Sequence, residues 1–563
     1  MGIKMRGSMA VIQSLLAEHV DTIFGYPGGA IMPIYDDLLQ HEDKIHHILV
    51  RHEQGAAHAT QAYSQVSGKV GVCFGTSGPG ATNLITGIAN AQIDSVPMVV
   101  ITAQVPSPLI GTDAFQETDV VGLTMPITKW NVQITDAEDI PEAIAKAFYI
   151  AVSGRPGVVV IDITKDALLN QLEFEYEKAP KIRSYFPYPA INMQSIDAAA
   201  ELINKSKKPL VLLGHGVLIG KAENLFREFV EKAEIPVAST LLGLSAFPSS
   251  HKLFVGMLGM HGNYAPNIKT NEADVIIAIG MRFDDRVTGR IADYARQAKI
   301  IHIEIDKSEI NKNIEVNVAV HADVKTALTA LLPKIQANAH SSWLNEFKEL
   351  EAIEIEKVIK KECTPESGKI RQGEVVHLLS EKTKGHAILV TDVGQNQMMG
   401  ARYFKFENPN SLITSGGLGT MGFGLPAAMG VSVVVKDRPV IAFLGDGGIQ
   451  MTIQELGTIM QENLAVKIVV VNNNFLGMVR QWQDMFMSKR YAATHMVTPD
   501  FIKIAEGYNI KGRKVEKREE LSAAIDEMFA TEGSFLLEVM VEKEGNVFPM
   551  ITPGASVSEI VLE

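Results

Sequence analysis

The chain alternates short, almost wholly apolar runs with stretches in which apolar residues recur every third or fourth position. The apolar runs predict ten strands, at 70–74, 97–102, 157–163, 209–214, 274–280, 300–305, 388–392, 440–446, 467–473 and 535–541. Their apolar residues are nearly continuous, which is typical of strands buried on both faces of a sheet. Residues 222–233 show instead the spacing of an amphipathic helix.

Strands that alternate with helices in this way predict parallel sheets in α/β domains. At 563 residues the chain is too long for one core, and about 150 residues per domain suggests three or four. Residues 165–195 lack periodicity and predict a linker, and the charged run within 338–372 predicts a solvated helix. We therefore expect three doubly wound parallel-sheet domains, at 1–170, 190–335 and 370–545, followed by a C-terminal tail at 546–563.

Composition narrows the class of protein. The hydrophobic share of 46% and the charged share of 21% are those of an ordinary globular protein, and the net charge of −13 argues against a nucleic-acid partner. Two cysteines exclude a disulfide framework and a zinc cluster. No run approaches the ~18 apolar residues of a membrane span, and the N-terminus has no targeting pattern. We expect a cytoplasmic protein without a membrane partner.

The residues that most clearly indicate a ligand site follow the predicted strand at 440–446. This strand ends in Gly445-Asp446-Gly447-Gly448, and a helix is expected from about Thr452. The next strand ends in Asn472-Asn473-Asn474. Both turns lie at the carboxyl ends of strands, where doubly wound sheets bind ligands, and glycines let backbone N–H groups approach a phosphate. Mg²⁺ prefers carboxylate and amide oxygens together with phosphates. The spacing predicts a metal-bound diphosphate held by Asp446 and Asn473.

This arrangement resembles the thiamine-diphosphate (ThDP) motif, in which GDG precedes NN by some two dozen residues. The resemblance implies Mg²⁺ held by Asp446, Asn473 and the backbone carbonyl of Phe475. ThDP enzymes also need a glutamate that shares a proton with the aminopyrimidine ring, and the best candidate is Glu53. It lies between an apolar run and a helix of small residues, a pattern that indicates burial; an isolated glutamate is otherwise most often a surface residue.

Further segments narrow the resemblance to one family. They are IFGYPGGAIMPIYD (23–36), RHEQGAAHA (51–59), GTSGPGATNLITGIANA (75–91), GTDAFQETD (111–119), GMRFDDRVTG (280–289), GGLGTMGFGLPAA (416–428), LGMVRQWQ (476–483) and NVFPMITPGASVSE (546–559). In them the chain is similar to the catalytic large subunits of acetohydroxyacid synthases, also called acetolactate synthases. That family decarboxylates pyruvate on ThDP and transfers the hydroxyethyl unit to pyruvate or 2-oxobutanoate, in branched-chain amino acid biosynthesis.

The resemblance implies roles for individual residues. Arg286 would hold the carboxylate of the second 2-oxo acid, a task that suits a guanidinium fork. Trp482 would line the pocket that favours 2-oxobutanoate. The other implied active-site residues are Gly29, Glu53, Phe115, Gln116, Lys165, Met478 and Val479. Taken alone, the RFDDR segment is also compatible with a salt-bridged loop, and Trp482 with a packing residue.

FAD is the third cofactor that the resemblance implies, bound by the middle domain; the GHG turn at 214–216 alone is weak support for a nucleotide. The expected cofactor contacts, Glu53 and Arg286 included, are Pro27, Arg155, Gly214, Gly216, Thr240, Leu241, Met260, His261, Gly280, Arg282, Asp284, Glu304, Ile305, Asp323, Val324, Val393, Gln395, Asn396, Gly416, Gly417, Gly419, Met421, Gly445, Asp446, Gly447, Gly448 and Asn473. Asn396 stands where many family members have histidine; it can donate a hydrogen bond to phosphate but carries no charge.

Several alternatives stay open on the same scaffold. A flavin-dependent pyruvate oxidase or a 2-oxo acid decarboxylase is the nearest, and Arg286 and Trp482 argue against both. A glyoxylate carboligase would lack the glutamate at position 53, a flavin-free catabolic acetolactate synthase would lack RFDDR, and a non-catalytic scaffold would not need Asp446. The resemblance also implies a homodimer or tetramer, with active sites between chains, and a small regulatory subunit as partner.

Overall fold

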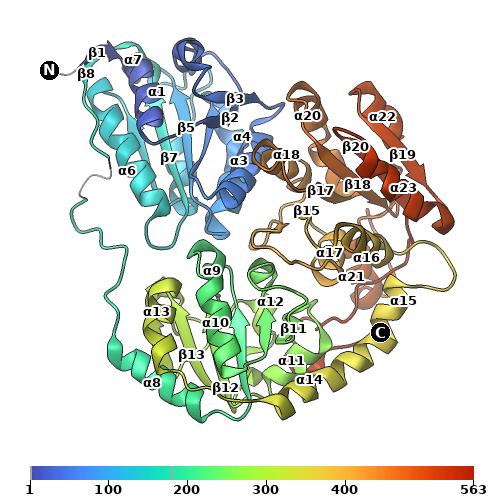
Figure 1. Ribbon diagram of the computed structural model, residues 1–563. Helices are drawn as coiled ribbons and strands as arrows, with labels where there is room; N and C mark the ends of the chain where they lie inside the picture. Colours follow the sequence, from blue (N-terminus) through green and yellow to red (C-terminus); the bar gives the residue numbers. More distant parts are fainter. Residues whose placement is uncertain (1–2, 179–181) are drawn as a thin grey trace.

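The computed structural model describes residues 3–178 and 182–563, which form three parallel six-stranded sheets flanked by helices (Figure 1). The first sheet has the order β3-β2-β4-β5-β7-β6. Its strands are β2 (Thr22–Gly25), β3 (His46–Leu49), β4 (Gly71–Gly75), β5 (Met98–Gln104), β6 (Trp130–Ile134) and β7 (Val158–Thr164). The expected α/β class is therefore confirmed.

The second and third sheets repeat this design. The order β11-β10-β9-β12-β13-β14 is built from β9 (Pro209–Leu213), β10 (Val237–Ser239), β11 (Phe254–Met257), β12 (Val275–Ile279), β13 (Lys299–Glu304) and β14 (Val318–His321). The order β16-β15-β17-β18-β20-β19 is built from β15 (Ile388–Thr391), β16 (Leu412–Ile413), β17 (Val440–Gly445), β18 (Val466–Asn472), β19 (Lys511–Val515) and β20 (Phe535–Met540). In each sheet the strand order reverses beside its first strand, between β2 and β4, between β9 and β12, and between β15 and β17, which creates a crevice at the carboxyl ends.

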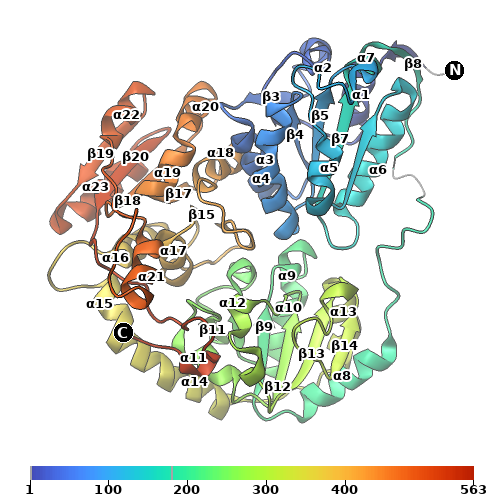
Figure 2. The same ribbon diagram turned by 180° about the vertical axis from the view of Figure 1, so that it is seen from behind.

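Helices cover both faces of each sheet (Figure 2). Those of the first domain are α1 (Gly7–Ala17), α2 (Met32–Leu38), α3 (Glu53–Ser67), α4 (Pro79–Ile93), α5 (Val120–Thr124), α6 (Ile140–Val152) and α7 (Lys165–Leu169). The middle domain has α8 (Met193–Lys205), α9 (Gly216–Ile219), α10 (Glu223–Ala233), α11 (Tyr264–Thr270), α12 (Asp285–Thr288) and α13 (Val324–Leu331), then α14 (Ser341–Glu354) and α15 (Lys360–Cys363). The third has α16 (Gln372–Thr383), α17 (Gln395–Tyr403), α18 (Gly424–Val434), α19 (Asp446–Met451), α20 (Leu456–Gln461), α21 (Gly477–Phe486), α22 (Phe501–Gly507) and α23 (Arg518–Ala530).

All ten strands expected from the apolar runs are present, and the helix expected at 222–233 is α10. The six strands at the sheet edges were not expected, because an edge strand is buried on fewer sides and carries polar residues, as in β3 (HHIL) and β19 (KGRKV). The interior strands β2 and β10 were not expected either; they span only four and three residues. The domain limits themselves stay predictions.

Two local expectations are wrong, and a third holds only in part. Residues 165–195 are not all linker, because α7 continues β7 and β8 (Gln171–Phe174) pairs antiparallel with β1 (Ile3–Arg6). The helix after the GDG turn begins at Asp446 rather than near Thr452, because the glycines themselves take helical geometry. The charged helix near 350 is not simply solvated, since Glu354 is 1% exposed and pairs with Arg402.

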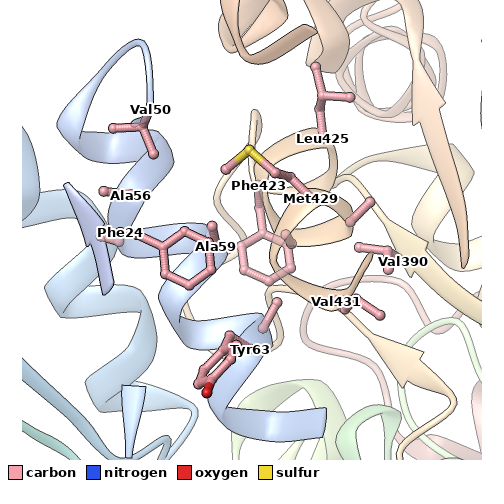
Figure 3. Close-up of a cluster of buried hydrophobic side chains, with 14 of the residues drawn as sticks. Phe24, Val50, Ala56, Ala59, Tyr63, Val390, Phe423, Leu425, Met429 and Val431 are labelled. Atoms are coloured by element: carbon pink, nitrogen blue, oxygen red, sulfur yellow. The ribbon is translucent and has the colours of Figure 1, made fainter. Parts of the chain in front are cut away.

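The first and third domains share one core, in which α3 packs across α18 (Figure 3). Phe24, Tyr63 and Ala59 meet Phe423 and the residues around it there. The helices approach closely, because a Cβ on Gly430 would lie 2.1 Å from the carbonyl oxygen of Ala59. This contact fixes the orientation of the Glu53 helix relative to the third domain.

The tail after residue 545 returns across the middle domain. The Ile551 N–H donates to the carbonyl of Met260 at 2.8 Å, and the Arg290 N–H donates to the carbonyl of Ala555 at 2.9 Å. In the part of the chain that the structure describes, no helix has both the length and the apolar character to cross a membrane.

Candidate active site

The expected site residues lie at the carboxyl edges of the three sheets. In the third sheet the order reverses between β15 and β17, and the helices that follow these strands, α17 and α19, carry Asn396 and Asp446 in their first turns. A pocket at this crevice is lined by twelve of the expected residues, Val393, Gln395, Asn396, Met421, Gly445, Asp446, Gly447, Gly448, Asn473, Phe475, Met478 and Val479. The structure thus brings together the residues of the predicted diphosphate site.

Two features of this pocket suit a metal-bound diphosphate. Asp446 is buried, its Oδ2 has no hydrogen-bond partner among the described residues, and burial raises its pKa to about 7. A buried carboxylate oxygen without a partner is costly unless a cation binds it. The glycine turn also packs directly on the loop after β15, since a Cβ on Gly448 would lie 2.4 Å from Oδ1 of Asp392. Within the described ranges, no three His, Cys, Asp or Glu side chains gather at one point, so a metal here would need phosphate oxygens as further ligands.

Asn396 does not offer its amide hydrogens to the pocket. Its Nδ2 donates to the carbonyls of Asp392 and Phe443, both at 3.0 Å, so Oδ1 is the atom left on the side of Gly394 and Gly445. The expectation that this side chain donates to a phosphate is therefore wrong for the geometry seen here. Gly394, two residues before Asn396, has φ 135°, which only glycine adopts readily.

Gln372 is a lining residue that the sequence did not reveal. It is 8% exposed, it lines the diphosphate pocket, and its Oε1 has no partner among the residues described. Glutamine at the first turn of a helix is common, so residue type alone carries no signal at this position.

A second cavity of about 940 Å³ lies at the reversal point of the middle sheet, between all three domains. Of the residues expected to contact FAD and the substrates, it is lined by Arg155, Gly216, Thr240, Leu241, Met260, His261, Gly280, Arg282, Asp284, Arg286, Glu304, Ile305, Asp323, Val324, Val393, Gly416, Gly417, Gly419, Met478, Val479 and Trp482. Gly214 lies behind the wall, where a Cβ would come within 2.2 Å of the Gly280 carbonyl. Asp94 and Ser95 of the first domain also line the cavity and were not expected.

This cavity fits a large nucleotide. Its volume is large enough for one. The turns after β9 and β12, which form its floor, lie so close together that a Cβ on Gly216 would lie 2.7 Å from Cα of Gly280. The Nδ1 atom of His261 is buried without a partner among the described residues. Burial raises the pKa of Glu304, at the end of β13, to about 7, so that this group can donate as well as accept.

Arg286 and Trp482 both line this cavity, together with Met478 and Val479, which also line the diphosphate pocket. The Arg286 side chain is 61% exposed, lies 3.6 Å from the Asp285 carboxylate, and donates from Nη1 to the sulfur of Met260 at 3.2 Å. Neither contact is a close ion pair, so the Arg286 guanidinium is available to an anion. Trp482 lies on α21, whose first turn contributes Met478 and Val479 to both cavities. The first turn of α21 therefore forms part of the wall of both cavities.

The remaining expected residues gather around the crevice of the first sheet. Glu53 begins α3, is 8% exposed, and accepts a hydrogen bond from Nδ2 of Asn83 at 2.9 Å. The loop that carries Gln116 packs on the turn after β4, since a Cβ on Gly78 would lie 2.9 Å from Cα of Gln116. Phe115 is 87% exposed. Pro27, Gly29 and Lys165 follow β2 and β7 at this edge. None of these first-domain residues lines either of the two cavities described above.

Comparison with known families identifies the class of protein. Family models for thiamine pyrophosphate (ThDP) enzymes match in chain order: the N-terminal TPP binding domain at residues 5–123, the central domain at 196–331 and the C-terminal TPP binding domain at 392–539. Fold, pocket and families agree that this is a ThDP enzyme.

The particular branch follows from full-length similarity. The chain is 45% identical over 570 residues to the acetolactate synthase large subunit of Parasynechococcus marenigrum, covering 99% of this chain and 90% of that one. It is 43% identical over 566 residues to the acetolactate synthase of Mycobacterium bovis (99% and 91%), and 44% identical over 556 residues to the large subunit of Lactococcus lactis (99% and 96%). The chain belongs to the acetolactate synthase family.

Proposed function

We propose that this chain is the catalytic subunit that joins two 2-oxo acids: it decarboxylates pyruvate and transfers the hydroxyethyl unit to pyruvate or 2-oxobutanoate. The products, acetolactate and acetohydroxybutanoate, feed branched-chain amino acid biosynthesis. One observation carries the proposal. Met478 and Val479 line both the diphosphate pocket and the cavity that holds Arg286 and Trp482, so the acceptor residues adjoin the cofactor site.

ThDP, when bound, supplies the electron sink that makes loss of CO₂ from a 2-oxo acid possible. Asp446, the side-chain oxygen of Asn473 and the carbonyl of Phe475 would hold Mg²⁺ against the diphosphate. Glu53 would share a proton with the aminopyrimidine ring; since Asn83 donates to its Oε2, Oε1 is left for this contact. Arg286 would orient the acceptor's carboxylate, and Trp482 would shape the space for its alkyl group.

FAD would occupy the cavity of the middle domain. Gly216 and Gly280 would let the dinucleotide approach the strand ends, with Gly214 packed behind them. Arg282 would add positive charge to the cavity wall, as would Arg155, which is also paired with Asp306 and Glu309. Release of FAD from purified protein by heat, followed by its absorbance, tests this; protein without flavin at every stage of purification would contradict it.

The active site would form between two chains. Glu53 and Gln116 lie outside both cavities of their own chain, and the loop beside them exposes Phe115 (87%) and Met125 (64%). A partner chain that covers this surface would bring its Asp446 to Glu53. A homodimer or tetramer, a small regulatory partner of the kind implied by relatives named large subunits, and a cytoplasmic location complete the proposal.

Product analysis tests the reaction. Pyruvate alone should give acetolactate, and pyruvate with 2-oxobutanoate should also give acetohydroxybutanoate; acetate or acetaldehyde as the main product would contradict the proposal. Arg286→Gln should raise the KM for the acceptor by at least about tenfold, as expected for a lost charged hydrogen bond. Arg290→Gln is the matched control, because Arg290 lies on the same segment but pairs with Asp293 and Glu559 instead.

Mixing tests the shared site. Chains carrying Glu53→Gln and chains carrying Asp446→Asn should each be inactive. After dissociation and reassembly, half of the dimers combine one chain of each kind and regain one intact site, so about a quarter of wild-type activity should return. Recovery of none would place each site within a single chain.

A further inference from the structure

Glu455 of the third domain reaches the turn that carries Glu53. It ends a short 3-10 helix (Ile453–Glu455) directly after α19, and its side chain is fully buried. The Arg51 N–H donates to Oε1 of Glu455 at 3.1 Å and to Oε2 at 3.2 Å. The contact joins residues 404 positions apart and lies two residues before Glu53, so it holds the entrance to α3 from the other domain.

The space around this carboxylate is closely fitted. A Cβ on Gly55 would lie 2.5 Å from Oε1 of Glu455, so the first turn of α3 accepts only glycine there. The Thr458 hydroxyl donates to Oε2 at 2.8 Å. Burial raises the pKa of Glu455 to about 7, which records how completely the group is removed from water.

The Arg51 side chain extends the same connection. Its Nη2 donates to the carbonyl of Gly457 at 3.2 Å and to Oε1 of Gln461 at 2.8 Å, while its Nη1 donates to the carbonyl of Leu49 at 2.7 Å. The segment between β3 and α3 is therefore bound to the segment after α19 through backbone and side chain alike. The shared core of α3 and α18 lies beside it (Figure 3).

We propose that Glu455 is a positioning residue for Glu53. By fixing the Arg51–Glu53 turn, Glu455 sets the direction in which the Glu53 side chain points from the start of α3. Glu455 itself belongs to the segment that begins at Asp446. In the dimer proposed above, Glu53 and Asp446 of one chain serve different active sites, so Glu455 would link the metal site of one to the proton-sharing carboxylate of the other. This inference rests on the proposed role of Glu53.

The test uses the full-length enzyme with ThDP and Mg²⁺. Glu455→Gln keeps the side-chain volume but turns an amide NH₂ toward the donors of Arg51 and Thr458. Three quantities are measured: the dissociation constant of ThDP by calorimetry, the exchange of its C2 proton for deuterium by quench-flow NMR, and amide hydrogen exchange over residues 49–58. We expect C2 exchange to slow by about tenfold, amide exchange in that segment to rise, and the ThDP dissociation constant to change less than about twofold.

Two further variants make the outcome decisive. Glu462→Gln is the matched control, because Glu462 also crosses to the first domain, at 2.9 Å from Nε2 of His46, but away from the turn of Glu53; it should leave all three quantities unchanged. If Glu455→Gln fails to fold, Thr458→Val removes one donor to the same carboxylate and should slow C2 exchange by about threefold.

The results separate the two hypotheses. If Glu53→Gln stops C2 exchange while the folded Glu455 and Thr458 variants exchange at the wild-type rate, the positioning role is refuted. A parallel loss of ThDP affinity in those variants would also refute it, because general disruption would then explain the effect. If Glu53→Gln itself exchanges normally, the role proposed for Glu53 fails instead.

Discussion

The buried ion pair of Glu354 and Arg402 provides the strongest test of what holds helix α14 against the third domain. Glu354 ends the long helix α14 and Arg402 lies in α17, whose first residues line the diphosphate pocket. Both side chains are almost fully buried, at 1% and 0% exposure. Glu354 also accepts from the Tyr264 N–H at 2.6 Å, and Arg402 donates to the carbonyl of Gly262 at 2.7 Å.

Glu354→Leu would leave a buried guanidinium without its counter-ion. Breaking a buried pair from one side costs about 3–5 kcal/mol, since the remaining charge cannot return to water. For a domain of 150–250 residues, 1 kcal/mol corresponds to about 2–4 °C, so the unfolding midpoint should fall by roughly 10 °C. Replacing both residues, as Glu354→Leu with Arg402→Met, should cost less than either change alone, because no charge is then stranded.

Differential scanning calorimetry at one protein and cofactor concentration measures these midpoints. Asp526→Asn is the control: Asp526 pairs with Lys382 at 2.6 Å but is 60% exposed, so its loss should cost less than about 1 kcal/mol. The reasoning is refuted if Glu354→Leu unfolds within about 2 °C of wild type, or if the double variant is no more stable than the single ones.

Three further changes probe the cofactor pockets. Because the pKa of Asp446 is raised to about 7, protons compete with the metal below that pH. Mn²⁺ affinity, measured by EPR with excess ThDP present, should fall about tenfold per pH unit below 7 and level off above it, and a flat profile would contradict this. Gly280 has φ 59°, and a Cβ there would lie 2.6 Å from Cα of Gly216; Gly280→Ala should lower bound flavin by at least about tenfold, and normal flavin absorbance would count against the assigned cavity. Asn396→Asp would set a carboxylate against two backbone carbonyls and the diphosphate; the ThDP dissociation constant should rise at least about tenfold, and unchanged binding would show that the carboxylate does not face the diphosphate.

Hydrophobic patterning predicted most interior strands of the three sheets, missed the short interior strands β2 and β10, and predicted none of the edge strands. β7 and β18 are buried along their whole length, so their sequences had to be apolar and stood out. β14 exposes part of its length and β16 spans only two residues, so neither produces a pattern above its surroundings. The sequence could not have shown β8 either, because its partner, β1, lies more than 160 residues away.

The residues of the candidate site also differ in whether a local sequence pattern could predict them. Asp446 and Asn473 could be predicted because a strand, a glycine turn and a second strand end are local features with a fixed spacing. Asp94 had no such signal: it lines the large cavity only because α4 ends where the third domain's loop crosses, and the N–H groups of Gly416 and Gly417 donate to its carboxylate at 3.0 and 2.7 Å. Contacts between domains depend on the assembled fold and leave no periodic trace in either partner.

The interdomain contacts also bear on how the proposed site between two chains can work. The face of α3 that contains Ala56 and Ala59 packs against α18 of the same chain. Helix α3 therefore cannot reorient within that chain to bring Glu53 to Asp446. Asp94 fixes the glycine loop of the large cavity from α4, and Asn83 of that same helix holds Glu53. Each chain would therefore present a rigid pair of half-sites to its partner, and the geometry of one active site would depend on packing inside both chains.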